Sequence, residues 1–231
     1  MSKPSIRENH EDKGDLPPAN YLHTFPPPNL TTTGIYVFIA SQRGGKTTMC
    51  AAMQKSLMRT NPDYKPILLC PEIREQFSFI PKKQCFTNPL NFASNVKKLV
   101  KIQNQHYKKY GYNTNIGLIM DDIMGHAVFN TKEWKDTMNI LAGSCRQPEN
   151  NITVFLLVQN ITAVPPAMRS NIYKLVVGDT TKEQCKKIAS CNNVYNHKQL
   201  YNVVSTYCCN HQMLYFDNMN SNDCLLIKCN V

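Results

Sequence analysis

The stretch from Ala40 to Thr47 reads Ala-Ser-Gln-Arg-Gly-Gly-Lys-Thr, follows the apolar run 35–39 and precedes a helix-like stretch at 48–59. A strand, a glycine-containing turn that ends in Lys-Thr and then a helix can cradle a polyphosphate with backbone N–H groups. Lys46 would then reach the β- and γ-phosphates, and the Thr47 hydroxyl would bind Mg²⁺. The pattern predicts a nucleoside triphosphate site formed by Ala40, Ser41, Gln42, Arg43, Gly44, Gly45, Lys46, Thr47 and Thr48.

One position of this phosphate loop (residues 40–47) departs from the pattern G-x-x-x-x-G-K-[ST], because Ala40 stands where the first glycine belongs. Alanine fits less well than glycine there only if the backbone needs a positive φ angle. The departure weakens the pattern without breaking it. The alternative interpretation is a Gly-Gly turn followed by an ordinary amphipathic helix.

A pair of carboxylates follows a second apolar strand. Residues 116–120 read Ile-Gly-Leu-Ile-Met and are followed by Asp121 and Asp122. On the phosphate-loop pattern, Asp121 would complete the Mg²⁺ shell begun by Thr47. Asp122 is placed to orient or deprotonate an attacking water. The alternative is an aspartate pair that caps a strand-to-loop turn.

Gln159 follows the apolar, β-branched run 152–158. A neutral amide there can hydrogen-bond both the γ-phosphate and the lytic water, although it can also be an ordinary polar residue leaving the sheet. Charge on a transferring phosphoryl group also requires an arginine, often from a neighbouring subunit. Three candidates remain, namely Arg146, Arg169 and, within the phosphate loop, Arg43.

Alternating strands and helices must position these residues. Apolar runs predict strands at 35–40, 66–70, 116–120, 152–158, 173–177, 213–216 and 225–227, and helical spacing predicts helices at 48–59, 91–110, from 131, at 165–172, 181–191 and 196–207. This alternation predicts a layered α/β fold. We expect a flexible N-terminal arm at 1–33, a core at 34–180, and C-terminal helices and strands at 181–231 in the same domain.

Composition favours a polyanionic partner. Lys and Arg outnumber Asp and Glu by 26 to 16, which gives a formal charge of +10. A surplus of this size is typical of proteins that bind nucleic acid or another polyanion. Lysines gather on one face of the predicted helix 91–110, where they contact either phosphates or only solvent. The sequence leaves both interpretations open.

The ten cysteines favour reduced thiols over a disulfide scaffold, because the chain is long for that class and opens without an apolar signal segment. No apolar run approaches the roughly eighteen residues needed to span a membrane, so we expect a soluble protein. Zinc is one interpretation of a C-terminal cluster. We prefer cysteines packed as small apolar side chains, because no Cys-x-x-Cys pair is present. The cluster comprises Cys185, Cys191, His197, Cys208, Cys209 and His211.

The motif segments resemble, in order and character, the FtsK/HerA group of DNA-pumping ATPases. More narrowly, the chain is similar to the viral genome-packaging ATPases of poxviruses, giant viruses and virophages. The resemblance covers residues 34–177 and is carried most by the run CRQPENNITVFLLVQNITAVPPAMRSNIYKLVV and by IGLIMDDI, which contains the Asp-Asp pair.

This resemblance implies a RecA-like (ASCE) P-loop NTPase core, with a mostly parallel central sheet flanked by helices. The strand before Gln159 would lie between the strands that lead to the phosphate loop and to Asp121. The same roles carry over for Lys46, Thr47, Asp121, Asp122 and Gln159. Among the arginines, the resemblance favours Arg146 over Arg169 as the residue supplied by a neighbouring subunit, and it leaves Arg43 open.

The resemblance also implies partners and a location. These are a pentameric or hexameric ring with nucleotide at its subunit interfaces, double-stranded DNA moved by ATP hydrolysis into a capsid, and capsid vertex proteins. We expect no membrane span, and a location in the viral factory of the host cytoplasm or in the virion. Two other functions stay open, a small-molecule P-loop kinase and a non-catalytic structural protein that binds nucleotide or DNA.

Overall fold

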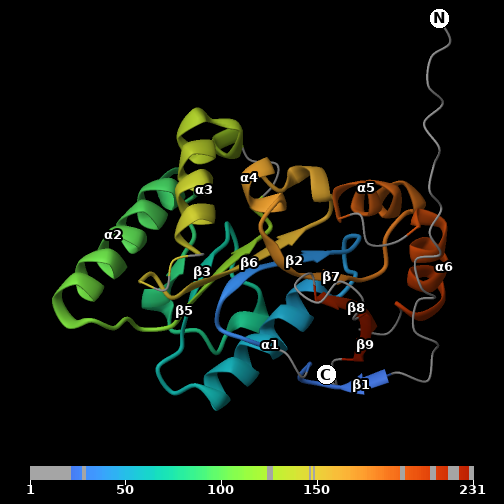
Figure 1. The fold of residues 1–231 in the computed structure, drawn as a ribbon, viewed down its shortest axis with the longest axis horizontal. Helices are drawn as coiled ribbons and strands as arrows, with labels where there is room; N and C mark the ends of the chain where they lie inside the picture. Colours follow the sequence, from blue (N-terminus) through green and yellow to red (C-terminus); the bar gives the residue numbers. More distant parts are fainter. Residues whose placement is uncertain are drawn as a thin grey trace, which may run out of the picture.

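A computed structural model describes residues 22–27, 30–123, 127–145, 147, 149–192, 196–208, 212–217 and 224–228. Within these residues nine strands form one sheet in the order β1-β9-β8-β7-β2-β6-β5-β3-β4 (Figure 1). The strands are β1 (Leu22–Thr24), β2 (Gly34–Ile39), β3 (Lys65–Leu69), β4 (Cys85–Phe86), β5 (Ile116–Asp121), β6 (Ile152–Val158), β7 (Ile172–Val177), β8 (Gln212–Asp217) and β9 (Cys224–Lys228).

The sheet is mostly parallel. From β7 through β2, β6, β5 and β3 to β4, every neighbouring pair is parallel, whereas β8 runs antiparallel to both β7 and β9. Parallel strands are covered on both faces and therefore have continuous apolar sequences. Strand β6, Ile-Thr-Val-Phe-Leu-Leu-Val, is buried at every position. The predicted α/β class with a mostly parallel sheet is confirmed.

Helices cover both faces of the sheet. They are α1 (Lys46–Thr60), α2 (Phe92–Tyr110), α3 (Lys132–Ser144), α4 (Pro166–Arg169), α5 (Lys182–Asn192) and α6 (His197–Tyr207). Helix α1 packs on one face, and α2 to α6 pack on the other (Figure 1).

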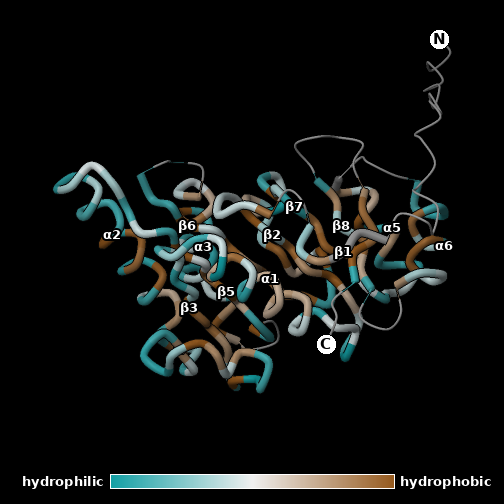
Figure 2. Tube along the Cα trace, turned by 90° about the horizontal axis from the view of Figure 1, so that it is seen from below, coloured by the Kyte–Doolittle hydropathy of each residue, from teal (hydrophilic) through white to brown (hydrophobic). Residues whose placement is uncertain are grey.

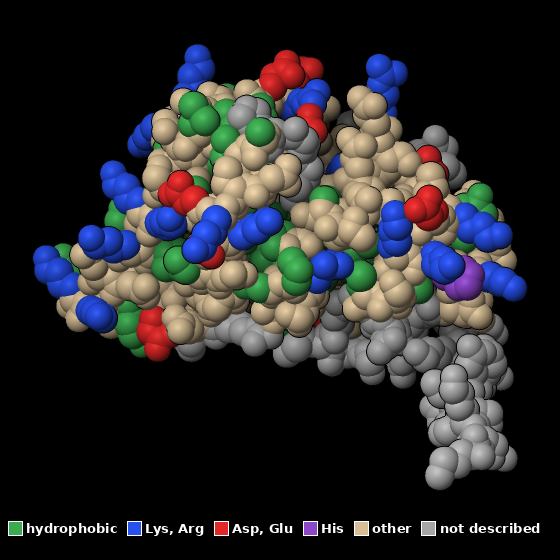
Figure 3. Space-filling view, turned by 90° about the horizontal axis from the view of Figure 1, so that it is seen from above, with side chains coloured by type: hydrophobic (Ala, Val, Ile, Leu, Met, Phe, Trp, Pro, Cys, Tyr) green, Lys and Arg blue, Asp and Glu red, His purple; other side chains and the backbone are tan. Residues whose placement is uncertain are grey.

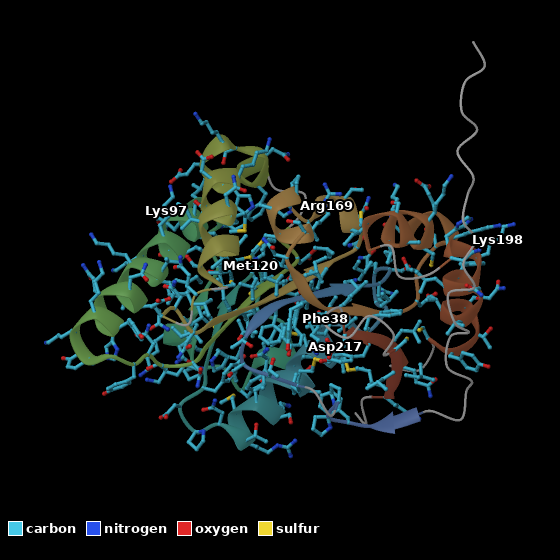
Figure 4. The ribbon with its side chains drawn as sticks, viewed as in Figure 1. Phe38, Lys97, Met120, Arg169, Lys198 and Asp217 are labelled. Carbon is cyan, nitrogen blue, oxygen red and sulfur yellow. The ribbon has the colours of Figure 1, made fainter. Side chains whose placement is uncertain are left out.

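Alternation along β2 shows how the two layers form. Ile35, Val37 and Ile39 face the core under α2 to α6, and Tyr36 and Phe38 face the core under α1. Hydrophobic residues run along the strands in Figure 2, and the labelled Phe38 lies inside the molecule in Figure 4. The phosphate loop therefore leaves a strand that is fixed by packing on both sides.

Most predicted elements are present with shifted ends. Helix α1 begins at Lys46 and not at residue 48, which places Lys46 and Thr47 in its first turn. The helix expected at 165–172 is only Pro166–Arg169, because the Asn171 side chain donates to the carbonyl of Ala167 (2.7 Å) and the chain turns into β7.

The chain ends add strands to the same sheet. Residues 22–24, inside the range expected to be an arm, form β1 parallel to β9, and Phe25 and Leu30 pack partly buried against the α1 side of the core. Beyond residue 180, α5, α6, β8 and β9 extend the fold.

Two sequence expectations concern membranes and zinc. Across the described ranges, every helix is too short or too polar to cross a bilayer. In the part of the chain that the structure describes, His, Cys, Asp and Glu residues form no group of three or more that could hold a metal. Cys185 and Cys208 are buried in the core, and Cys209 and His211 lie outside the described residues.

Candidate nucleotide-binding site

The predicted site residues meet at one edge of the sheet. Strands β2, β5 and β6 are parallel neighbours, so their carboxyl ends lie at the same edge, where α/β proteins bind ligands. A cavity of about 740 Å³ opens there between the phosphate loop, Asp121, Asp122 and Gln159. Residues 42–48 line it, and Ala40 and Ser41 form the base of the loop.

Backbone geometry shapes the phosphate loop. Gly45 has a φ of 82° and caps α1, and Arg43 has a φ of 61°. Left-handed residues reverse the chain so that successive N–H groups turn towards one concave surface, which suits an anion at a helix N-terminus. The loop therefore has the form expected of a phosphate cradle.

Lys46 is held inside this loop. Its Nζ donates to the carbonyl oxygens of Ala40 (2.7 Å) and Ser41 (2.8 Å). Partial burial lowers the pKa of Lys46 from its ordinary value, and the charges of Asp121 and Asp122 oppose that shift. The ammonium group thus lies inside the phosphate loop, where the charges of two carboxylates act on it.

Thr47 and Asp121 form the candidate magnesium site. The Thr47 hydroxyl donates to Oδ2 of Asp121 at 3.0 Å. Burial raises the pKa of Asp121, and the hydrogen bond from Thr47 opposes that rise. Adjacent ligands of an octahedral Mg²⁺, each about 2.1 Å from the ion, lie about 3.0 Å apart. The spacing and the hard oxygen donors therefore fit Mg²⁺.

Asp122 differs from Asp121 in its surroundings. It has a φ of 53°, an angle that aspartate adopts more readily than most residues, and its side chain is 56% exposed. Its Oδ2 accepts a hydrogen bond from Nη2 of Arg74 at 3.0 Å. Arg74 comes from the loop after β3, lines the cavity, and was missed by the sequence analysis. It lies beyond the end of β3 in a stretch with little periodicity, so no local pattern marks it.

Gln159 lies where the resemblance implied. Strand β6 runs between β2 and β5, so the residue that follows it reaches the cavity between the phosphate loop and the two aspartates. The Gln159 side chain is exposed there. Asn160, the next residue, instead accepts a hydrogen bond from the backbone N–H of Thr162 (3.0 Å).

The three candidate arginines are separated. Arg43 lines the cavity. Arg169 lies at the end of α4 (Figure 4), where its Nη1 donates to Sγ of Cys191 (3.7 Å). It is not among the described residues that line this cavity. Arg146 lies outside the described residues.

Ala40 is accommodated by glycines around it. The φ angle of Ala40 is not positive, so the backbone does not require glycine at this position. A Cβ at Gly44 would lie 2.8 Å from Cβ of Ala40, and one at Gly178 would lie 3.0 Å from it. Gly178 also donates its N–H to the carbonyl of Ile39 (2.8 Å). The space that alanine needs is thus provided by Gly44 and Gly178, and sequence reasoning missed Gly178.

Comparison with known proteins places this geometry on a known fold. No family model matches the sequence, and no curated protein matches it. The DNA-packaging ATPase B204 from Sulfolobus turreted icosahedral virus superimposes with a TM-score of 0.58 at 16% identity, over 86% of this chain and 98% of B204. B204 from Sulfolobus turreted icosahedral virus 2 in complex with ATP-γS gives 0.58 at 15% identity, over 87% and 100%.

A protein that is more distant in sequence has a similar fold. The cytoplasmic domain of the type VII secretion ATPase EccC from Thermomonospora curvata gives a TM-score of 0.65 at 9% identity, and the match spans 86% of this chain but only 25% of EccC. The resemblance had predicted such a fold, and these comparisons confirm it. The chain therefore has a RecA-like P-loop fold, which it shares with the DNA-packaging ATPase B204 and with the type VII secretion ATPase EccC.

Proposed function

We propose that this protein hydrolyses ATP and uses the energy to move double-stranded DNA into a preformed viral capsid. The observation that carries the proposal is the convergence of Lys46, the Thr47–Asp121 pair and Gln159 on one cavity. The cavity belongs to a fold shared with a DNA-packaging ATPase. Both the catalytic roles and the DNA substrate are part of the proposal.

Each side chain has a role in the proposed reaction. Lys46 and the N–H groups of the phosphate loop bind the phosphates, and Thr47 and Asp121 would hold Mg²⁺, which neutralises charge on the phosphate oxygens. Asp122 and Gln159 position a water molecule. Its oxygen bonds to the γ-phosphorus as the bond from that phosphorus to the ADP oxygen breaks, and its proton passes to Asp122.

In this scheme a neighbouring subunit supplies the positive charge that the transferring phosphoryl group still needs. We propose a ring of five or six subunits in which Arg146 of a neighbouring subunit reaches the nucleotide. Arg43, at the cavity, is the alternative from the same subunit, and Arg169 is disfavoured by its contact with Cys191. Capsid vertex proteins are the proposed docking partners, in the viral factory of the host cytoplasm or in the virion.

Contact with DNA is supported by α2. This helix contains five lysines and no acidic residue, and Lys and Arg side chains gather over α2 and α3 at the left of Figure 3. A groove of about 390 Å³ beside it is lined by Lys97, Lys101 and Lys108. Lysines spaced along a helix contact phosphates without reading bases. A protein that moves DNA of any base sequence requires contacts of this kind.

ATP hydrolysis at low salt, measured with and without double-stranded DNA, tests this function. We expect DNA to stimulate phosphate release by the wild-type protein, and Lys46→Ala to abolish it. Phosphate transfer to a nucleoside without DNA stimulation would instead identify a small-molecule kinase. Nucleotide binding without any hydrolysis would identify a structural protein.

A further inference from the structure

We propose that Arg74 senses the γ-phosphate within its own subunit, exchanging the Asp122 carboxylate for the terminal phosphate when ATP binds. The inference rests on the proposed function and concerns the same cavity. It assigns Arg74 two successive partners. Asp122 would lose its arginine partner when a triphosphate occupies the cavity, which leaves the whole carboxylate to hydrogen-bond water.

Packing in the core holds the backbone of Arg74 in place. Strand β3 is parallel to β5, so the loop after β3 emerges at the same sheet edge as Asp121 and Asp122. Arg74 precedes a short 3-10 turn at Glu75–Phe77, and its carbonyl accepts the N–H of Phe77 (2.9 Å). The Phe77 side chain is fully buried against the α1 side of the core. Packing therefore anchors the backbone while the guanidinium group reaches the cavity.

The two carboxylates of the site have different partners. Asp121 is buried and accepts a hydrogen bond from Thr47 (3.0 Å), whereas Asp122 is exposed and accepts one from Arg74 (3.0 Å). The carboxylate proposed to activate water is thus the one engaged by an arginine. That hydrogen bond uses one acceptor position of Oδ2 of Asp122, and water must compete with Arg74 for that position.

Exchange of partners is energetically accessible. The Arg74 and Asp122 side chains are 46% and 56% exposed, and ion pairs between exposed side chains contribute little to stability. A terminal phosphate has more charge and more acceptor oxygens than one carboxylate, and a guanidinium group binds it through paired hydrogen bonds. Arg74 should therefore prefer the γ-phosphate of ATP. ADP lacks that group and should leave Arg74 on Asp122.

Binding of ATP-γS and ADP to Arg74→Ala separates this role from a structural one. We expect the Kd of ATP-γS to rise about tenfold or more, as for loss of a charge-assisted hydrogen bond to phosphate, and the Kd of ADP to change less than about twofold. Arg74→Lys keeps the charge without the paired donors and should give an intermediate Kd. Arg59→Ala, an exposed arginine in the last turn of α1, is the matched control and should change neither.

A double-mutant cycle tests the exchange itself. Asp122→Asn removes the competing anion, so it should tighten ATP-γS binding more in the wild-type background than with Arg74→Ala. Equal tightening of ATP-γS binding by Asp122→Asn in both backgrounds would overturn the Arg74 proposal, and so would equal weakening of ATP-γS and ADP binding by Arg74→Ala. Neither result would contradict the proposed hydrolysis of ATP. A wild-type protein that binds neither nucleotide would overturn the proposed function as well.

Discussion

Gly178→Ala should weaken nucleotide binding from outside the cavity. A Cβ at this position would lie 2.9 Å from Cε of Met213, 3.0 Å from Cβ of Ala40 and 3.1 Å from the carbonyl oxygen of Gly44. Met213 can move because the close atom is the end of a flexible side chain, but the other two contacts belong to the phosphate loop. Overpacking of this kind destabilises by about 1–3 kcal/mol. The loop can avoid it by shifting a few tenths of an ångström.

A bound nucleotide must return the loop to its original position. Much of the overpacking energy should therefore be lost from the free energy of nucleotide binding. We expect a loss of about 1–2 kcal/mol, which corresponds to a rise in Kd of about 5-fold to 30-fold. The assay is titration with a fluorescent ATP analogue, together with thermal unfolding to follow any remaining loss of stability.

Two further variants make this prediction specific. Ala40→Gly removes the Cβ that lies 3.0 Å from the new methyl group, but the contact with the carbonyl oxygen of Gly44 (3.1 Å) remains. The double variant Ala40→Gly, Gly178→Ala should therefore recover part of the lost affinity. Gly143→Ala in α3, where a Cβ meets nothing within 4 Å, is the control and should leave Kd unchanged. Wild-type affinity and stability in Gly178→Ala, or no recovery with Ala40→Gly, would refute the reasoning.

Three other outcomes follow from single side chains. Asp122→Asn should still bind ATP but hydrolyse it about 100-fold more slowly or worse in single-turnover assays, whereas unchanged turnover would exclude Asp122 as the base. Lys174→Met removes the buried cation that pairs with Asp217 on the neighbouring strand, and it should lower the free energy of unfolding by about 3–5 kcal/mol in urea titrations. A loss below about 1 kcal/mol, the value of an exposed pair, would contradict this. Burial raises the pKa of Cys70 to about 12, so at pH 8 only about one thiol in 10,000 is ionised, and iodoacetamide should label the exposed Cys191 but not Cys70 in the folded protein.

The sequence predicted the elements whose signals are local. Strand β6 is continuously apolar, and α3 begins where Thr131 caps it by accepting the N–H of Trp134 (3.2 Å). The phosphate loop and the Asp121–Asp122 pair were found in the same way, because each follows an apolar strand directly. The position of β6 between β2 and β5 came from family resemblance, since periodicity says nothing about strand order.

The missed features depend on distant pairings. Arg74 lies in a stretch with little periodicity, and its partner Asp122 is 48 residues away, so only the neighbouring positions of β3 and β5 reveal the pair. Strand β1 pairs with β9, more than 200 residues later in the chain. Gly178 resembles any glycine after a strand until the packing around Ala40 is known. Long-range contacts of this kind leave no local pattern.

Displacement of a triplex-forming oligonucleotide from linear duplex DNA tests most directly whether the site of Lys46 drives movement along double-stranded DNA. A motor that travels along the duplex removes the third strand without melting the other two. We predict displacement by the wild-type protein with MgATP, and none with ATP-γS or with Lys46→Ala. Wild-type protein that hydrolyses ATP in the presence of DNA but leaves the third strand bound would contradict the account.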